Sequence, residues 1–215
     1  MNLGQFHDRV SQAIKRGNSL DSLIPFWVAE AAQTIEQNYT FSWMRRVGEV
    51  TKLAGDNQPN RIAFPNNRVK SFEFIQYVWD PNMDAEYRQF IKLRGVSPEE
   101  VTGISWGQPQ GYWLDGLEWI YLDAIPGQDA TYRLAWNEYT DWPLDENATP
   151  SLLARGQMLL FAETMIAFST EQKDERMAQA WTARAQQGYN FLLRAEEELK
   201  MQHQSDQRMI YSGLR

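Results

Sequence analysis

LLARGQMLLFAETMIAF, residues 152–168, is the stretch that decides the fold. A surface helix carries its apolar side chains on one stripe, whereas here they occupy nearly the whole helical circumference. Thr149 and Pro150 precede the run and suit a helix cap and a first helical position. The sequence therefore predicts a helix that is buried on several sides.

A second helix is expected after the acidic turn TEQKDE, and it has the clearest apolar stripe in the chain. Seven residues recur at spacings of 4, 4, 3, 4, 3 and 4: Met177, Trp181, Ala185, Gly188, Leu192, Ala195 and Leu199. This spacing is typical of one seam of a bundle helix. Glu196, Glu197 and Glu198 are expected to form a solvated face beside it. The helical period is lost after His203, so the last stretch predicts an extended tail.

Two more helices are predicted at the N-terminal end. The first has apolar residues at helical spacing from Leu3 to Ile14, and Gly17 ends it. The second opens at Ser19 and carries a broad apolar stripe that includes Trp27 and Val28. We expect Trp27, Val28, Met177, Trp181, Leu192 and Leu199 to form the core of a helical bundle.

The middle of the chain changes period and reads as strands. Six short segments are β-branched or aromatic and partly alternating: RRVGEVTKL, NRIAF, VKSFEFIQYVW, GYWL, LEWIYLDA and TYRLAWNEY. Asp115-Gly116 suits a two-residue type I′ hairpin turn. SPEEV suits a short helical turn with Ser97 as cap and Glu100 completing a capping box.

This order of elements predicts an α+β fold. The simplest packing places two N-terminal and two C-terminal helices in one four-helix bundle, with a strand-rich antiparallel domain inserted between the halves. The expected boundaries are 1–40 for the first helical pair, 41–147 for the β-rich domain, 148–204 for the second pair, and 205–215 for the tail.

Composition limits the function. There are no cysteines, which excludes disulfides and thiolate chemistry, and no apolar run is long enough for a membrane helix. The N-terminus lacks a signal-peptide core, so synthesis in a cytoplasm is expected. The net charge is −7, of which residues 71–150 carry −10. Such a chain is poorly suited to gripping nucleic acid, although it could surround DNA without holding it.

Two catalytic patterns deserve weighing. Gly103, Ser105 and Gly107 form the G-x-S-x-G of a serine-hydrolase elbow, with His203 downstream. An elbow needs a helix after the serine, and Pro109 and Gly111 forbid one, so Ser105 is interpreted as a turn residue.

Asp115 and Glu118, near Trp113 and Trp119, could form a glycosidase acid pair. The hairpin turn and strand alternation already account for both acids. No P-loop or H-E-x-x-H motif is present. No catalytic residue, cofactor or metal is therefore predicted.

Several segments in order resemble the head-to-tail adaptor (connector, or neck) proteins of tailed bacteriophages. The resemblance covers residues 18–200 and rests on IPFWVAEAAQTIEQN, AFPNN, GQPQGYWLDG, IYLDAIPGQDATYRLAWNEY and NATPSLLARGQMLLFAETMIAFSTEQKDERMAQAW. Phe64 stands where the family usually has Leu, and Asn66 where it usually has Asp.

The resemblance implies a structural virion protein rather than an enzyme. Its members form a homo-oligomeric ring, commonly a dodecamer, with the portal protein above, tail or nozzle proteins below, and DNA passing through without sequence-specific binding. It implies a place in the neck of the virion. The alternatives are another virion ring, such as a tail terminator, and a small serine hydrolase using Ser105.

The C-terminal segment is the candidate binding site for the portal or a neighbouring subunit. Its apolar and basic residues cannot build a core of their own, and Arg and Tyr are favoured interface anchors. The candidate residues are Arg208, Met209, Ile210, Tyr211, Leu214 and Arg215.

Overall fold

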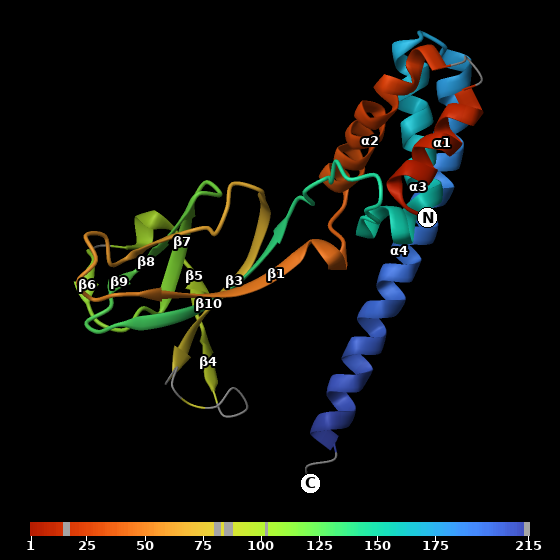
Figure 1. Ribbon diagram of the computed structural model, residues 1–215. Helices are drawn as coiled ribbons and strands as arrows, with labels where there is room; N and C mark the ends of the chain where they lie inside the picture. Colours follow the sequence, from red (N-terminus) through yellow and green to blue (C-terminus); the bar gives the residue numbers. More distant parts are fainter. Residues whose placement is uncertain (15–17, 80–82, 84–87, 102, 213–215) are drawn as a thin grey trace. The chain divides into compact units, whose positions relative to one another are not determined.

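The computed structural model describes residues 1–14, 18–79, 83, 88–101 and 103–212, without the side chains of 18, 19, 79, 200 and 202–212 (Figure 1). The fold is α+β. The chain divides into two compact units: unit 1 contains Met1–Trp43 and Asp141–Arg215, and unit 2 contains Met44–Thr140. Unit 1 holds the four α-helices and unit 2 holds the strands.

Unit 1 is built around one apolar helix. Its helices are α1 (Leu3–Ile14), α2 (Ile24–Asn38), α3 (Ser151–Glu171) and α4 (Glu175–Ser212), with a 3₁₀ turn η1 (Asn18–Leu23) before α2. α3 packs against α1, α2 and α4, and it buries residues around most of its circumference. The prediction that residues 152–168 are buried on several sides is confirmed.

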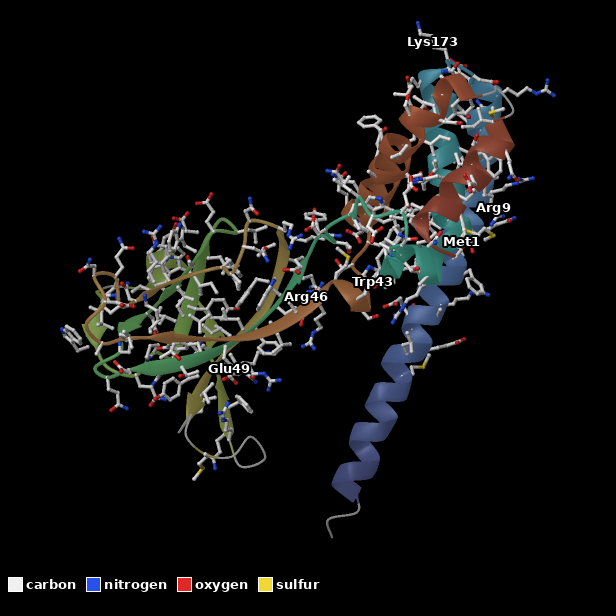
Figure 2. The ribbon with its side chains drawn as sticks, in the orientation of Figure 1. Met1, Arg9, Trp43, Arg46, Glu49 and Lys173 are labelled. Atoms are coloured by element: carbon white, nitrogen blue, oxygen red, sulfur yellow. The ribbon has the colours of Figure 1, made fainter. Side chains whose placement is uncertain are left out.

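The helix ends follow local chemistry. Asn2 and Gln5 form a reciprocal cap on α1, in which each side-chain oxygen accepts from the other residue's backbone N–H. Asp174 caps α4 by accepting from the Met177 N–H at 3.0 Å. Lys173, at the tip of the turn between α3 and α4, has a φ of 56° (Figure 2).

α4 is longer than the sequence predicts, and this corrects the extended tail. The helix continues to Ser212, so residues 205–212 are helical. At about 1.5 Å per residue, its 38 residues span about 57 Å, whereas the 21 residues of α3 span about 32 Å. α4 therefore continues beyond the N-terminal end of α3, as Figure 1 shows in blue.

The predicted bundle core is only partly buried. Trp27, Val28 and Leu192 are at most 2% exposed. The prediction that Met177 and Leu199 lie in the core is wrong, because they are 37% and 36% exposed. Both lie near the limits of the overlap between α4 and α3, where the partner helix covers less of the seam.

Trp181 is half-buried, with its ring centroid 5.5 Å from that of Phe161. The prediction that Trp181 belongs to the core is therefore correct for only part of its side chain.

Glu196 also differs from expectation, because it is only 4% exposed. Its carboxylate accepts from the Ser42 N–H at 2.8 Å and the Ser42 hydroxyl at 3.1 Å, and it pairs with Arg155 at 3.5 Å. The Arg155 guanidinium also lies 5.6 Å from the ring centroid of Trp43, which Figure 2 labels. This charged side chain thus joins α4 to α3 and to the segment after α2.

Unit 2 contains two four-stranded sheets that share one core. The first has the order β1 (Arg45–Lys52), β10 (Ala130–Glu138), β3 (Val69–Trp79), β4 (Gln89–Lys92) and is antiparallel. The second has the order β2 (Arg61–Ala63), β8 (Trp119–Leu122), β7 (Gly111–Asp115), β5 (Arg94–Gly95). Ile75, Ile120 and Leu134 are completely buried between them.

The six predicted strands are all present, and four further short strands were not predicted. The missed strands are β4, β5, β6 (Ser105–Trp106) and β9 (Ala124–Ile125). Two pairings are parallel, β5 with β7 and β6 with β9, so the sheets are not purely antiparallel.

The turns in unit 2 form at the predicted places with different geometry. The β7–β8 hairpin has Asp115 opposite Trp119, which leaves a three-residue loop. Gly116 alone in it has a positive φ, of 61°, whereas a type I′ turn requires two such residues. Ser97 begins the 3₁₀ turn η3 (Pro98–Glu100), but its side chain makes no cap.

The β-rich unit is slightly shorter than the expected range of 41–147. Its boundaries with unit 1 lie at Trp43/Met44 and Thr140/Asp141. Ser42 belongs to unit 1 through its bonds to Glu196. On the other side, the Leu3 and Gly4 N–H groups donate to the backbone carbonyls of Ala148 and Glu146 at 3.0 and 2.9 Å. These bonds tie the segment before α3 to the start of α1.

Candidate interaction surfaces

The environment of Ser105 does not form a hydrolase elbow. Ser105 lies in β6, which pairs with β9, and this corrects its assignment as a turn residue. The residue is exposed, and β7 rather than a helix follows it. His203 lies on α4, in the other unit, and its side chain is outside the described residues. The strand–turn–helix setting of an elbow is therefore not formed at Ser105.

The acid pair near the tryptophans also lacks a catalytic setting. Asp115 and Glu118 are both exposed, at the end of β7 and in the loop after it. The Arg61 guanidinium lies 3.3 Å from the ring centroid of Trp119. Trp113 is stacked on Tyr121, with centroids 5.3 Å apart. Each indole therefore has one face covered by a neighbouring side chain of unit 2.

Neither a metal centre nor a membrane span is found in the described part of the chain. No group of three or more His, Asp or Glu residues there could hold a metal ion. None of its helices combines the length and apolarity that crossing a membrane requires.

A buried carboxylate organises the β1–β10–β3 sheet, where the β10–β3 register shifts at Asn137/Glu138. Glu138 is 7% exposed. It accepts from Arg46 Nε at 2.8 Å, Asn66 Nδ2 at 2.8 Å and Trp136 Nε1 at 3.3 Å; Figure 2 labels Arg46. Burial acts to raise the pKa of Glu138, but the bonds from Asn66, Trp136 and Arg46 outweigh it and hold the pKa below its usual value.

This network gives a physical reason for Asn at position 66. Its Nδ2 donates to Glu138, and its Oδ1 accepts from the Arg68 N–H at 2.9 Å. An aspartate could accept from Arg68 but could not donate to Glu138. Phe64 is 8% exposed and packs edge-on against Phe72, with centroids 5.6 Å apart, in the core of unit 2. Of the two departures from the resembled pattern, Asn66 makes hydrogen bonds and Phe64 packs in the core.

The C-terminal candidates are placed only as backbone. Residues 208–211 lie in the last turns of α4, and the side chains of Arg208, Met209, Ile210 and Tyr211 are outside the described residues. Leu214 and Arg215 lie outside the described residues altogether.

A groove runs between α2 and α3 in unit 1. It has a volume of about 470 Å³ and is lined by Phe26, Glu30, Ala31, Thr34, Glu163, Ile166, Ala167, Thr170 and Glu171. Phe26 is 65% exposed at this groove. The lining contains three carboxylates and no Lys or Arg. Sequence patterns had placed α2 and α3 in a core, and they did not reveal that the two helices leave an acidic groove between them.

One groove carboxylate is hydrogen-bonded inside unit 1, and a second is partly buried. Glu171 accepts from the indole N–H of the buried Trp27. Glu163 is partly buried, and this burial raises the pKa of its carboxyl group. Glu30 is exposed and makes no ion pair with another described residue.

A second surface of unit 1 is formed by the side of α4 that faces away from α3, here called the α4 outer face. It consists of five exposed residues at spacings of 4, 3, 4 and 3: Ala180, Arg184, Gln187, Phe191 and Arg194. Phe191 is 68% exposed, more than any other phenylalanine with a described exposure. Residues 176–195 contain three arginines and no Asp or Glu. This surface is basic and apolar in a protein that is acidic overall.

Neither a protein-family model nor a curated protein matches this chain.

Proposed function

We propose that this chain is a head-to-tail adaptor, a structural virion protein that forms a ring below the portal of a tailed bacteriophage. It connects capsid to tail and surrounds the DNA exit channel. The observation that carries the proposal is the division of the chain. Both chain ends contribute to one helical unit, while the middle forms a β-rich unit of its own. This is the order of elements on which the resemblance to the adaptor family rests.

The shape of α4 supports a role in joining proteins. The end of α4 continues past α3, the helix against which it packs. The last turns carry Arg208, Met209, Ile210 and Tyr211. We propose that this segment docks as a helical end on the portal or a neighbouring subunit, since an amphipathic helix in a groove is a common recognition mode.

The charge distribution supports a channel through which DNA slides. Phosphate contacts need clustered Lys and Arg, and residues 71–150 instead carry a charge of −10. The expected behaviour is weak, sequence-independent contact with DNA that added salt weakens further.

The test is reconstitution with the portal protein from the same genome. The purified chain is mixed with assembled portal, separated by size exclusion, and imaged by negative-stain electron microscopy. A ring of density below the portal, commonly twelve-fold, is the expected result.

The two alternatives give different results. A tail terminator would bind the end of the tail tube and leave the portal free. A serine hydrolase would be labelled at Ser105 by a fluorophosphonate probe. Failure to bind the portal, with either of these results, would overturn the proposal.

A further inference from the structure

Unit 1 presents two exposed surfaces of opposite character. The α2–α3 groove is acidic and has Phe26 at its edge, while the α4 outer face is basic and has Phe191 at its centre. Large exposed aromatic side chains next to charged groups are typical of interface anchors. Each surface therefore has the composition that the other would bind.

Glu30 in the groove and Arg194 on the α4 outer face are available for pairing. Neither Glu30 nor Arg194 forms an ion pair with another described residue of its own chain. α2 contains no Lys or Arg, and residues 156–171 of α3 contain none either. The groove thus has no cation of its own that would compete with an arginine from outside.

The two surfaces lie on different sides of unit 1. α3 packs against both α2 and α4, and the α2–α3 groove involves no residue of α4. The residues of α4 that face α3 include Ala185, Gly188 and Leu192, whereas Phe191 and Arg194 point away from that contact. A chain with complementary surfaces on different sides can bind a second copy at each of them.

We propose that the α4 outer face of one copy docks in the α2–α3 groove of a second copy, making a head-to-tail contact between chains. Arg194 pairs with Glu30, Arg184 approaches the other groove carboxylates, and Phe191 packs beside Phe26. Guanidinium groups suit such pairing because they bind carboxylates in a bidentate manner. This contact specifies the surfaces through which copies would meet in the proposed ring. It rests on the proposed function only in the expectation that successive contacts close into a ring.

A second copy is a better occupant than DNA. The groove carboxylates would repel phosphate, and Arg184 and Arg194 are about 15 Å apart along the helix with an exposed phenylalanine between them. Binding of nucleic acid to the α4 outer face is instead an outcome that the experiment can detect.

The experiment measures self-association of the full chain by sedimentation velocity, over a wide range of concentration and without portal or nucleic acid. The wild type is expected to form species larger than a monomer. Glu30→Arg and Arg194→Glu should each weaken self-association by at least about tenfold. Phe26→Ser and Phe191→Ser should weaken it as well.

Two further measurements make the test specific. The double variant Glu30→Arg/Arg194→Glu should regain association, because the charges are exchanged across the contact. A mixture of the two single variants should also associate beyond a dimer, with the two variants alternating, because one contact is then the wild-type pair and the next is the exchanged pair.

The matched controls are Glu99→Arg in unit 2 and Lys173→Glu at the α3–α4 turn. Both residues are exposed and lie outside the two surfaces, and both variants should associate as the wild type does. Circular dichroism of every variant confirms that loss of association is not loss of folding.

The inference is overturned if the wild type stays monomeric, if the charge reversals leave association unchanged, or if the controls weaken it equally. It is also overturned if the α4 outer face proves to bind duplex DNA and not protein. These outcomes are separate from failure of the adaptor role, because portal binding is measured in another assay. A chain could bind the portal through its C-terminal segment while its copies meet through other surfaces.

Discussion

Gly188 on α4 lies directly against Leu159 on α3. A Cβ atom at position 188 would be 3.0 Å from both the Cα and the Cβ of Leu159 and 3.2 Å from its backbone nitrogen. Across the same interface, a Cβ on Gly156 would be 3.1 Å from a methyl group of Leu192. The glycines therefore set how closely α3 and α4 approach, which explains why a helix seam tolerates two residues of poor helix propensity.

Gly188→Ala is expected to destabilise unit 1 by about 1–3 kcal/mol, because the added methyl group meets backbone atoms that cannot rotate away. The effect should appear although alanine is the better helix former by about 1 kcal/mol. Urea unfolding followed by circular dichroism measures it, and Gln187→Ala at the exposed neighbouring position is the control. A Gly188→Ala protein that is more stable than the wild type would contradict the close approach.

Trp27→Ala should cost more than Trp181→Ala. Trp27 is 1% exposed and packs against Phe168 with centroids 5.2 Å apart, so its removal should cost about 3–5 kcal/mol. Trp181 is half-buried, so its removal should cost clearly less. Denaturant unfolding of the two variants under the same conditions decides the order, and equal losses would show that α4 is covered more fully at Trp181 than its exposure indicates.

Asn66→Asp should destabilise unit 2 at neutral pH. The substitution removes the donor to Glu138 and places a second carboxylate beside it, and an unsatisfied buried partner costs about 1–3 kcal/mol. Asn66→Ser, which keeps a short donor without the charge, is the comparison. If the aspartate variant unfolds like the wild type at neutral pH, the contact between positions 66 and 138 is not made in solution.

The stability of unit 2 should depend on pH through Glu138. Its pKa is lowered in the folded state, so its contribution is present above the unfolded value of 4.5 and is lost as the pH falls through the folded pKa. Glu138→Gln should remove this part of the pH dependence and leave a flatter profile in the acidic range. Thermal unfolding of both proteins between neutral pH and acid is the measurement, and parallel profiles would exclude Glu138 as the source.

Deletion of residues 205–215 should separate folding from portal binding. The end of α4 lies beyond α3, so the shortened protein should keep its thermal transition while losing a small part of its helix signal. It should also lose capture by immobilised portal, if the segment docks as proposed. Undiminished capture would move the portal-binding surface elsewhere on the chain.

The sequence by itself determined the kinds of elements and their order. The all-round apolar run at 152–168 specified a central helix, and β-branched or aromatic segments specified six of the strands, because periodicity directly reflects which side chains need burial. Two-residue strands such as β6 carry no period to detect. The last helical turns of α4 were also not predicted. The residues after His203 are mostly polar, so no apolar stripe indicates that the helix continues.

Only the tertiary structure decided which side chains of each element are covered. The same stripe on α4 contains the buried Leu192 and the exposed Met177, because burial depends on where α3 begins and ends. The burial of Glu196 and Glu138 depends on residues distant in sequence: Ser42, Arg46 and Asn66 supply hydrogen bonds, and Arg155 supplies an ion pair. The α2–α3 groove likewise exists only once two helices lie side by side, so no local pattern could have specified it.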